Sequence, residues 1–171
     1  MQKGNFINDS LFGKLKLECF NCLYKNESIS INNKEIQIEI EVQADKNNKI
    51  SIEQYANYLW FKDNWDKFEK VLLLKILEYY KKRRAYLLEE YDYNIDEEFE
   101  DRFPDINNIE EIAELIDDPV ITFVHSDNFE YLEYEIGIMF NCEWEPGDSL
   151  GITIKNKEIT NIGWRDIVWQ N

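Results

Sequence analysis

Alternation of apolar and polar residues dominates the first third of the chain. Leu11 to Glu18 alternates, Cys19 to Tyr24 is a second apolar-rich run, and Glu35 to Gln43 repeats with a period of two. This period is typical of strands that bury one face and leave the other in water. Asn32-Asn33 and Asp45 to Asn48 supply turn residues between the runs. The first third therefore predicts an antiparallel β-meander.

Beyond Ile50 the apolar spacing changes to three and four residues. Ser51-Ile-Glu-Gln54 matches a capping box, in which the serine and glutamine side chains satisfy the free amides at a helix start. A stripe of aromatic and aliphatic residues then predicts a long helix from about Asn64 to Tyr91. Lys81 to Arg84 lies near the end of that helix, where cations favour the helix dipole. This basic run is therefore explained by helix structure.

An acidic stretch follows, from Asp92 to Asn107. It contains Pro104 and has no clear period, so it is expected to be an irregular connection. Asn108 to Ile116 has an asparagine cap, early carboxylates and helical spacing, which predicts a short helix. The sequence Asp117-Asp118-Pro119 is expected to end it, because the residue before proline disfavours helical geometry.

The last third again has strand composition. The expected strands are Val120 to Val124, Tyr131 to Phe140, Leu150 to Ile154 and Glu158 to Ile162, with Asn156-Lys157 as a tight hairpin turn. The order of elements predicts an α+β fold: an antiparallel β-meander, central helices and then a second group of antiparallel strands. The length of 171 residues predicts a single α+β domain covering residues 1–171.

Charge is distributed very unevenly. The chain has a net charge of −16, and from Ala85 to Ile154 it carries 21 acidic residues against one basic residue, Arg102. Nucleic acid and anionic membrane surfaces both require lysine and arginine on the protein, so neither is expected to be a partner. The longest strictly aliphatic run is Val71 to Leu74, and the N-terminal residues have no apolar signal core, so a cytoplasmic location is expected. A basic protein is the complementary partner.

Few residues suggest catalysis or metal binding. Cys19-Phe-Asn-Cys22 would need Cys142 and His125 to complete a zinc site, and the expected state of the cysteines is reduced thiols without a metal. A triad drawn from His125, Ser126 and Asp127 is disfavoured, since adjacent strand residues point to opposite faces. We therefore expect no cofactor and no metal.

Three segments resemble an uncharacterised family of small bacterial proteins. They are Leu11-Phe-Gly-Lys-Leu15 with its Phe-Gly-x-Leu motif, Cys142 to Ile152 with its Trp-x-Pro-x-x-x-Leu-Gly motif, and Ile159 to Gly163. Gly147-Asp148 stands where that family tends to have Glu-His, so no role of that histidine is transferred. The resemblance implies no catalytic activity, and similar proteins look like members of bacterial toxin-immunity neighbourhoods. A purely structural interpretation places Trp144 in the core and uses Gly151 and Gly163 for close backbone approach.

The sequence thus favours an acidic protein-binding module, specifically a bacterial immunity protein that neutralises a basic toxin. Two alternatives stay open: a small hydrolase using acidic residues with or without a divalent metal, and a structural or regulatory subunit. The expected partner site combines aromatic anchors with a carboxylate rim. Its candidate residues are Tyr91, Tyr93, Asp96, Glu97, Glu98, Phe99, Glu100, Asp101, Phe103, Asp105, Glu110, Glu111, Glu114, Asp117 and Asp118.

Overall fold

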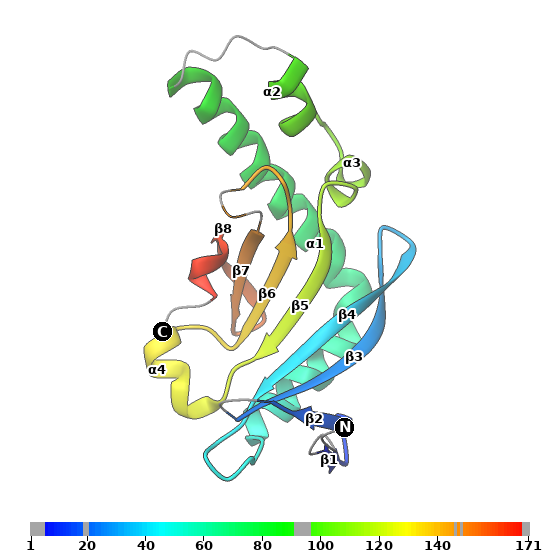
Figure 1. Ribbon diagram of the computed structural model, residues 1–171, viewed down its shortest axis with the longest axis vertical. Coiled ribbons are helices and arrows are strands. Elements are labelled where there is room, and N and C mark those ends of the chain that lie inside the picture. Colours follow the sequence, from blue (N-terminus) through cyan, green and yellow to red (C-terminus); the bar gives the residue numbers. More distant parts are fainter. Residues whose placement is uncertain (1–5, 19–20, 91–96, 146, 148, 169–171) are drawn as a thin grey trace.

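The strands of the protein form one sheet whose spatial order follows the chain order (Figure 1). The computed structural model describes residues 6–18, 21–90, 97–145, 147 and 149–168. The strands are β1 (Phe6–Asp9), β2 (Gly13–Leu17), β3 (Cys22–Ile31), β4 (Lys34–Gln43), β5 (Asp117–Phe123), β6 (Ile136–Asn141), β7 (Ser149–Lys155) and β8 (Glu158–Trp164). The helices are α1 (Ile52–Glu90), α2 (Glu97–Arg102), α3 (Ile109–Ala113) and α4 (Phe129–Leu132), with 3₁₀ turns η2 (Ser126–Asn128) and η4 (Arg165–Ile167).

Two antiparallel groups of strands are joined by one parallel pair. Strands β2 to β4 form the expected N-terminal meander, β1 adds an unexpected strand at its edge, and β5 to β8 form the second antiparallel group. Between them β4 and β5 run parallel, with Glu39 opposite Val120 and Val42 opposite Phe123. A parallel pair requires a crossover connection, and here it contains α1, α2 and α3. The α+β fold predicted from the sequence is confirmed.

The predicted capping box opens a single long helix. The Ser51 backbone amide donates to Gln54 Oε1 at 2.9 Å, and the Gln54 backbone amide donates to Ser51 Oγ at 3.3 Å. The expected helix start near Asn64 is wrong, because α1 continues unbroken from Ile52 to Glu90 with no glycine or proline to interrupt it. At 1.5 Å per residue this helix is roughly 58 Å long. Among the described residues, no helix combines the length and apolarity needed to cross a bilayer.

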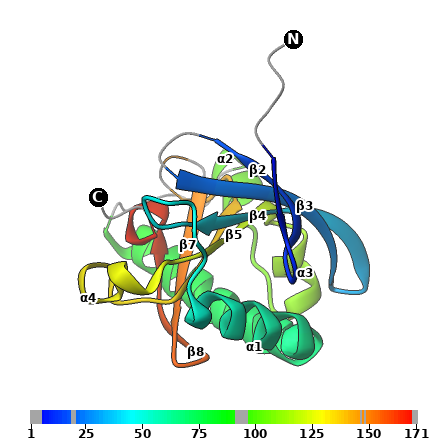
Figure 2. The ribbon, with the colours of Figure 1, turned by 90° about the horizontal axis from the view of Figure 1, so that it is seen from below.

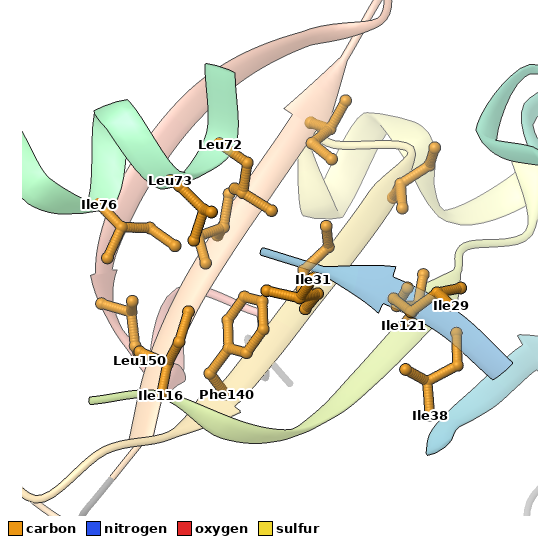
Figure 3. Close-up of a cluster of buried hydrophobic side chains, with 14 of the residues drawn as sticks. Ile29, Ile31, Ile38, Leu72, Leu73, Ile76, Ile116, Ile121, Phe140 and Leu150 are labelled. Carbon is orange, nitrogen blue, oxygen red and sulfur yellow. The ribbon is translucent and has the colours of Figure 1, made fainter. Parts of the chain in front are cut away.

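The main core lies between α1 and one face of the sheet (Figures 1 and 2). Figure 3 shows Leu72, Leu73 and Ile76 of α1 directed toward the sheet, where Phe140 and Leu150 meet them. Burial of such side chains contributes about 1.5–3 kcal/mol each. The expected core position of Trp144 is confirmed, since this side chain is 2% exposed.

Polar contacts fix the long β3–β4 hairpin against α1. The Trp65 indole N–H donates to the Ser30 carbonyl at 2.7 Å, and the Asn32 amide donates to Glu69 Oε1 at 2.6 Å. Asn32 and Asn33 both have positive φ, 48° and 60°, as the expected tight turn requires. The buried Glu69 carboxylate therefore holds the hairpin tip over the helix.

Two expected strands are shorter than predicted. Asp9 Oδ1 accepts hydrogen bonds from the amides of Leu11 and Phe12, both at 2.8 Å, so the chain turns there and β2 begins only at Gly13. Tyr131 lies in α4 rather than in a strand, and β6 begins at Ile136. In both places local turn chemistry overrides the alternating pattern.

The acidic connection is also more regular than expected. Glu97 to Arg102 form α2, whereas the sequence predicted irregular structure from Asp92 to Asn107. Phe99 and Phe103 are four residues apart and both are buried, which gives this segment an apolar face to bury. Residues 91–96 lie outside the described part of the chain.

The C-terminal segment covers part of the second face of the sheet. The Tyr134 hydroxyl donates to the Val168 carbonyl, and a Cβ built on Gly137 would lie 2.5 Å from Val168 Cγ1. At Gly151 such a Cβ would lie 3.0 Å from the Arg165 Cα, so the expected close backbone approach is confirmed there. Gly163 has only ordinary contacts of 3.8 Å or more, and the same expectation is wrong for it.

Gln54 offers a test of the junction between the two strand groups. Its fully buried side-chain amide donates to the Gln43 backbone carbonyl at 2.7 Å and to the Phe123 backbone carbonyl at 2.8 Å, and so bridges the ends of β4 and β5. Gln54→Leu leaves the buried Phe123 carbonyl and the part-buried Gln43 carbonyl without this donor, and we expect the free energy of unfolding in urea to fall by about 2–4 kcal/mol. Gln37→Leu, the same substitution at an exposed position of β4, should change it by less than about 0.5 kcal/mol. Equal effects of the two substitutions would contradict the bridging role.

Candidate functional site

Strand β5 begins with a bulge that carries two exposed aspartates. Its register against β6 shifts after Asp117, and Asp118 has a φ of 43°, a left-handed conformation that aspartate tolerates. Pro119 fits the bulge because it has no amide hydrogen to donate to a ladder. Asn141 Nδ2 donates to Asp118 Oδ2 at 3.3 Å and orients that carboxylate. The bulge thus presents adjacent carboxylates where the chain re-enters the sheet.

Three adjoining pockets surround this bulge. The first has a volume of about 440 Å³ and lies between the β3–β4 hairpin tip, the end of α3 and β5. The second, also about 440 Å³, lies between the bulge and η4, and the third, about 700 Å³, extends between α2, the end of α3 and residues 141–144, 147 and 149. Asp118 lines the first and second pockets, Asp117 the first and third, and Arg165 the second and third. We call the three together the acidic hollow.

Carboxylates outnumber cationic groups in the acidic hollow. The acidic side chains that line it are Asp101, Glu114, Asp117, Asp118, Glu143 and Asp166, and the basic ones are Lys34, Arg102 and Arg165. Two of the basic groups have acceptors in the protein: Lys34 forms an ion pair with Glu114, and Arg102 Nε donates to the Glu143 carbonyl at 2.9 Å. With six carboxylates against three basic groups, the lining of the hollow is therefore acidic on balance.

A buried carboxylate anchors the wall of the third pocket. Glu145 is 2% exposed, its Oε1 lies 3.6 Å from Arg83 Nε of α1, and it forms a hydrogen bond with the Tyr79 hydroxyl. Burial raises the pKa of the Glu145 carboxyl above its ordinary value, while the Tyr79 hydrogen bond and the Arg83 guanidinium act in the opposite direction. The neighbouring Trp144 packs edge to face on Tyr80 at 5.1 Å. Segment 142–145 is thereby attached to α1.

The predicted aromatic anchors of the site are core residues. Phe99 and Phe103 are 5% and 9% exposed and stack on each other at 5.2 Å. Arg84 of α1 pairs with Glu100 at 2.5 Å and donates to the Phe103 carbonyl at 2.8 Å, so α2 is held against the helix. A buried side chain offers little area to a partner, and this pair serves to position α2.

The other predicted residues divide between exposed and undescribed positions. Tyr91, Tyr93 and Asp96 lie outside the described residues, and so do the side chains of Glu97 and Glu98 at the start of α2. The rest are exposed: Asp101, Asp105, Glu110, Glu111, Glu114, Asp117 and Asp118.

Four of these exposed residues meet in the acidic hollow, namely Asp101, Glu114, Asp117 and Asp118. Glu111 instead lies in the first turn of α3, where its carboxylate accepts from the Asn107 backbone amide at 2.6 Å and its own backbone amide donates to Asn108 Oδ1 at 2.9 Å. The hydrogen bond from the Asn107 amide lowers the pKa of the Glu111 carboxyl. The expected asparagine cap at Asn108 is confirmed.

Sequence reasoning missed the contribution of the last third of the chain. Glu143, Arg165 and Asp166 complete the hollow, although they lie far from Asp101 in sequence. For Glu143 the signal was the segment from Cys142 to Ile152, which stood out as a motif and contributes residues 142–144, 147 and 149 to the hollow's wall, whereas Arg165 and Asp166 lie outside it. Only strand order places that segment beside α2 and the β5 bulge.

The remaining candidate chemistry does not converge. In the described ranges no three His, Cys, Asp or Glu side chains form a group able to hold a metal ion, so Cys22, Cys142 and His125 do not meet. Cys22 Sγ instead donates to Glu41 Oε1 at 3.3 Å. His125 Nδ1 accepts from the Asp127 amide at 3.3 Å, a local contact at the end of β5. Cys19 lies outside the described residues.

Comparison with known proteins identifies one family. The family described as "Domain of unknown function (DUF6985)" matches residues 11–169. No curated protein and no solved structure matches the chain significantly.

The buried Glu145 predicts a specific pH dependence. A carboxyl whose pKa is higher in the folded than in the unfolded protein stabilises the fold when protonated, and this contribution is lost as the pH rises through the folded pKa. Glu145→Gln cannot ionise, so the difference in unfolding free energy between variant and wild type should move in favour of the variant as the pH rises above 4.5. Urea unfolding between about pH 4 and pH 7 measures this difference. A trend toward wild type for Glu145→Gln as the pH rises would contradict the interpretation.

Proposed function

The chain belongs to the DUF6985 family, and we propose that it is an acidic protein-binding module whose partner is a basic protein. More specifically, we propose a bacterial immunity protein that neutralises a basic toxin. The observation that carries it is the acidic hollow, where six carboxylates line three adjoining pockets around the β5 bulge.

Long-range electrostatics supports a basic partner. The segment from Ala85 to Ile154 has a net charge of −20, and every acidic lining residue except Asp166 lies within it. Charge of one sign around a concave surface focuses the field and raises association rates, to about 10⁸–10⁹ M⁻¹s⁻¹ in steered complexes. A basic protein is therefore guided to this end of the sheet.

The shape of the hollow supports a protein partner. Buried apolar side chains, among them Ile31, Ile116 and Phe140, line the first pocket, while carboxylates surround it. Protein interfaces combine an apolar centre with a polar rim in this way. The burial of Phe99 and Phe103 moves the proposed contact surface from the acidic connection to the edge around Asp117 and Asp118.

A toxin that acts on nucleic acid has the complementary surface. Such an enzyme presents lysine and arginine to phosphate groups, and an acidic inhibitor occupies the same surface by imitating that charge. The resemblance of Leu11 to Leu15 and Cys142 to Ile152 to immunity-like proteins points in the same direction.

Co-expression tests the specific form of the proposal. The protein encoded by the gene next to this one is produced in a bacterial host with and without the chain. We expect that protein to be basic and toxic alone, and the chain to restore growth and to co-purify with it at equal stoichiometry. A neighbouring product that is harmless alone, or a toxin that the chain neither binds nor neutralises, contradicts the immunity function.

Location of charge, rather than total charge, should control binding. A triple lysine variant changes exposed carboxylates that line the third pocket, and a control makes the same change in net charge at exposed positions elsewhere. The site variant is Asp101→Lys, Asp117→Lys and Glu143→Lys; the control is Asp63→Lys, Asp66→Lys and Glu158→Lys. The site variant should lower the association rate with the basic partner by about tenfold or more and reduce its salt dependence, and the control by about threefold or less.

Stopped-flow association at several salt concentrations measures both effects. Urea unfolding first establishes that each variant is folded. Equal losses in the two variants would mean that net charge alone governs the encounter, and the site assignment would then be wrong.

A further inference from the structure

The first pocket has apolar walls and an acidic mouth. Ile31, Ile116 and Phe140 are 6%, 8% and 1% exposed and line it together with Ile36 and Pro119. Its volume of about 440 Å³ falls within the roughly 300–1,000 Å³ typical of small-ligand sites. These walls come from the β3–β4 hairpin tip, the end of α3 and β6, all fixed by core packing. The pocket is thus largely formed before a partner arrives.

Three carboxylates and one ammonium group lie at the pocket. Glu114, Asp117 and Asp118 are exposed, and Lys34 from the opposite wall forms an ion pair with Glu114. The Lys34 and Glu114 side chains are 61% and 58% exposed, and ion pairs between solvent-exposed side chains contribute little to stability. The protein's own lysine therefore already places a cation at the mouth, in a contact that another cation can replace.

The combination of apolar walls and exposed carboxylates favours one kind of side chain in the first pocket. A purely apolar side chain would leave the carboxylates desolvated without a partner, and a small cation would leave the apolar walls empty. Arginine has an aliphatic stem to pack on Ile36 and Phe140, and its planar guanidinium carries five donors that several carboxylates can share. Lysine has a similar stem but a compact charge with three donors.

We propose that the first pocket receives an arginine side chain of the basic partner, with the guanidinium between Asp117, Asp118 and Glu114. This inference rests on the proposed function, because it names the residue through which a basic protein is held. The carboxylates alone do not define the site; the apolar pocket beneath them does. Lys34 acts as a competitor that the arginine displaces from Glu114.

A short peptide tests the pocket without the partner. Acetyl-Gly-Arg-Gly-amide is titrated into protein with ¹³C-labelled isoleucine methyl groups, alongside the citrulline peptide, which has the same shape without the charge, and the lysine peptide. We expect saturable shifts of the Ile31, Ile36 and Ile116 methyl signals with the arginine peptide, at a dissociation constant in the millimolar range, and no saturable shifts with citrulline. Ile162 of β8, which does not line the pocket, serves as the internal reference.

Substitutions on both sides of the mouth should act in opposite directions. Asp118→Asn keeps a residue that tolerates positive φ and should weaken arginine-peptide binding by about fivefold or more. Lys34→Ala removes the competing cation and should strengthen it by about threefold, whereas Lys46→Ala, an exposed lysine in the β4–α1 connection, should leave it within about 1.5-fold. Equal shifts with citrulline, shifts outside the pocket, or weaker binding after Lys34→Ala would overturn the assignment. A lysine peptide that binds tighter than the arginine peptide would overturn the choice of arginine.

The same variants separate this inference from the proposed function. If the basic partner binds wild type, loses affinity for the triple lysine variant, and binds Asp118→Asn and the pocket-filling Ala113→Trp as wild type does, the module function stands and the arginine pocket is wrong. If the arginine peptide fills the pocket but no basic protein binds the chain, the proposed function is wrong. Methyl spectra of Ala113→Trp confirm that the variant is folded.

Discussion

The parallel pairing of β4 with β5 is the constraint on which the rest of the structure depends. Two antiparallel meanders become one sheet only through this pair, and a parallel pair cannot be closed by a tight turn. The connection has to cross the sheet, and α1 does so while burying its apolar stripe against one face. Gln54 satisfies carbonyls at the ends of both strands. The chain must then return to the sheet, and the β5 bulge is the place where it does.

The acidic hollow is a consequence of that return. Because α2 and α3 lead the acidic stretch back along α1, Asp101 and Glu114 line one pocket with Asp117, and Glu114 lines another with Asp117 and Asp118, rather than standing in an isolated loop. Strand β6 and the segment after it close the opposite side, which Glu145 attaches to α1 through Tyr79 and Arg83. Repulsion among these groups is tolerated since the lining residues face water, while the carboxylate that is buried has partners.

Local chemistry made part of this structure predictable from sequence. The Ser51–Gln54 capping box and the turn at Asn32-Asn33 depend on residues adjacent in the chain, and the structure confirms them. The α+β class followed from the order of alternating and helical patterns. Four residues of the hollow were also predictable from sequence, because they lie in the segment with the highest density of carboxylates. The charge indicates the segment that contains the site but not which of its side chains are exposed, since Phe99 and Phe103 belong to the acidic stretch and are buried.

Non-local packing decided the rest. No pattern in the sequence indicates that β4 pairs with β5, because strand pairing depends on faces buried by residues far apart. For the same reason the sequence did not predict that Glu143, Arg165 and Asp166 line the hollow, because the order of the strands brings them there. The expected strand from Tyr131 failed for a different reason, as Glu133 adopts a φ of 57° and breaks the alternation with a turn.

Gly137 links the middle of the sheet to the end of the chain. Its missing side chain leaves room for Val168, whose carbonyl also accepts from Tyr134, so the buried Val168 side chain packs on β6. Proteases cleave backbone segments that unfold locally, and a segment packed against the sheet resists cleavage. Resistance of the backbone near Val168 to an endoprotease therefore reports on the integrity of the sheet, from the face opposite α1.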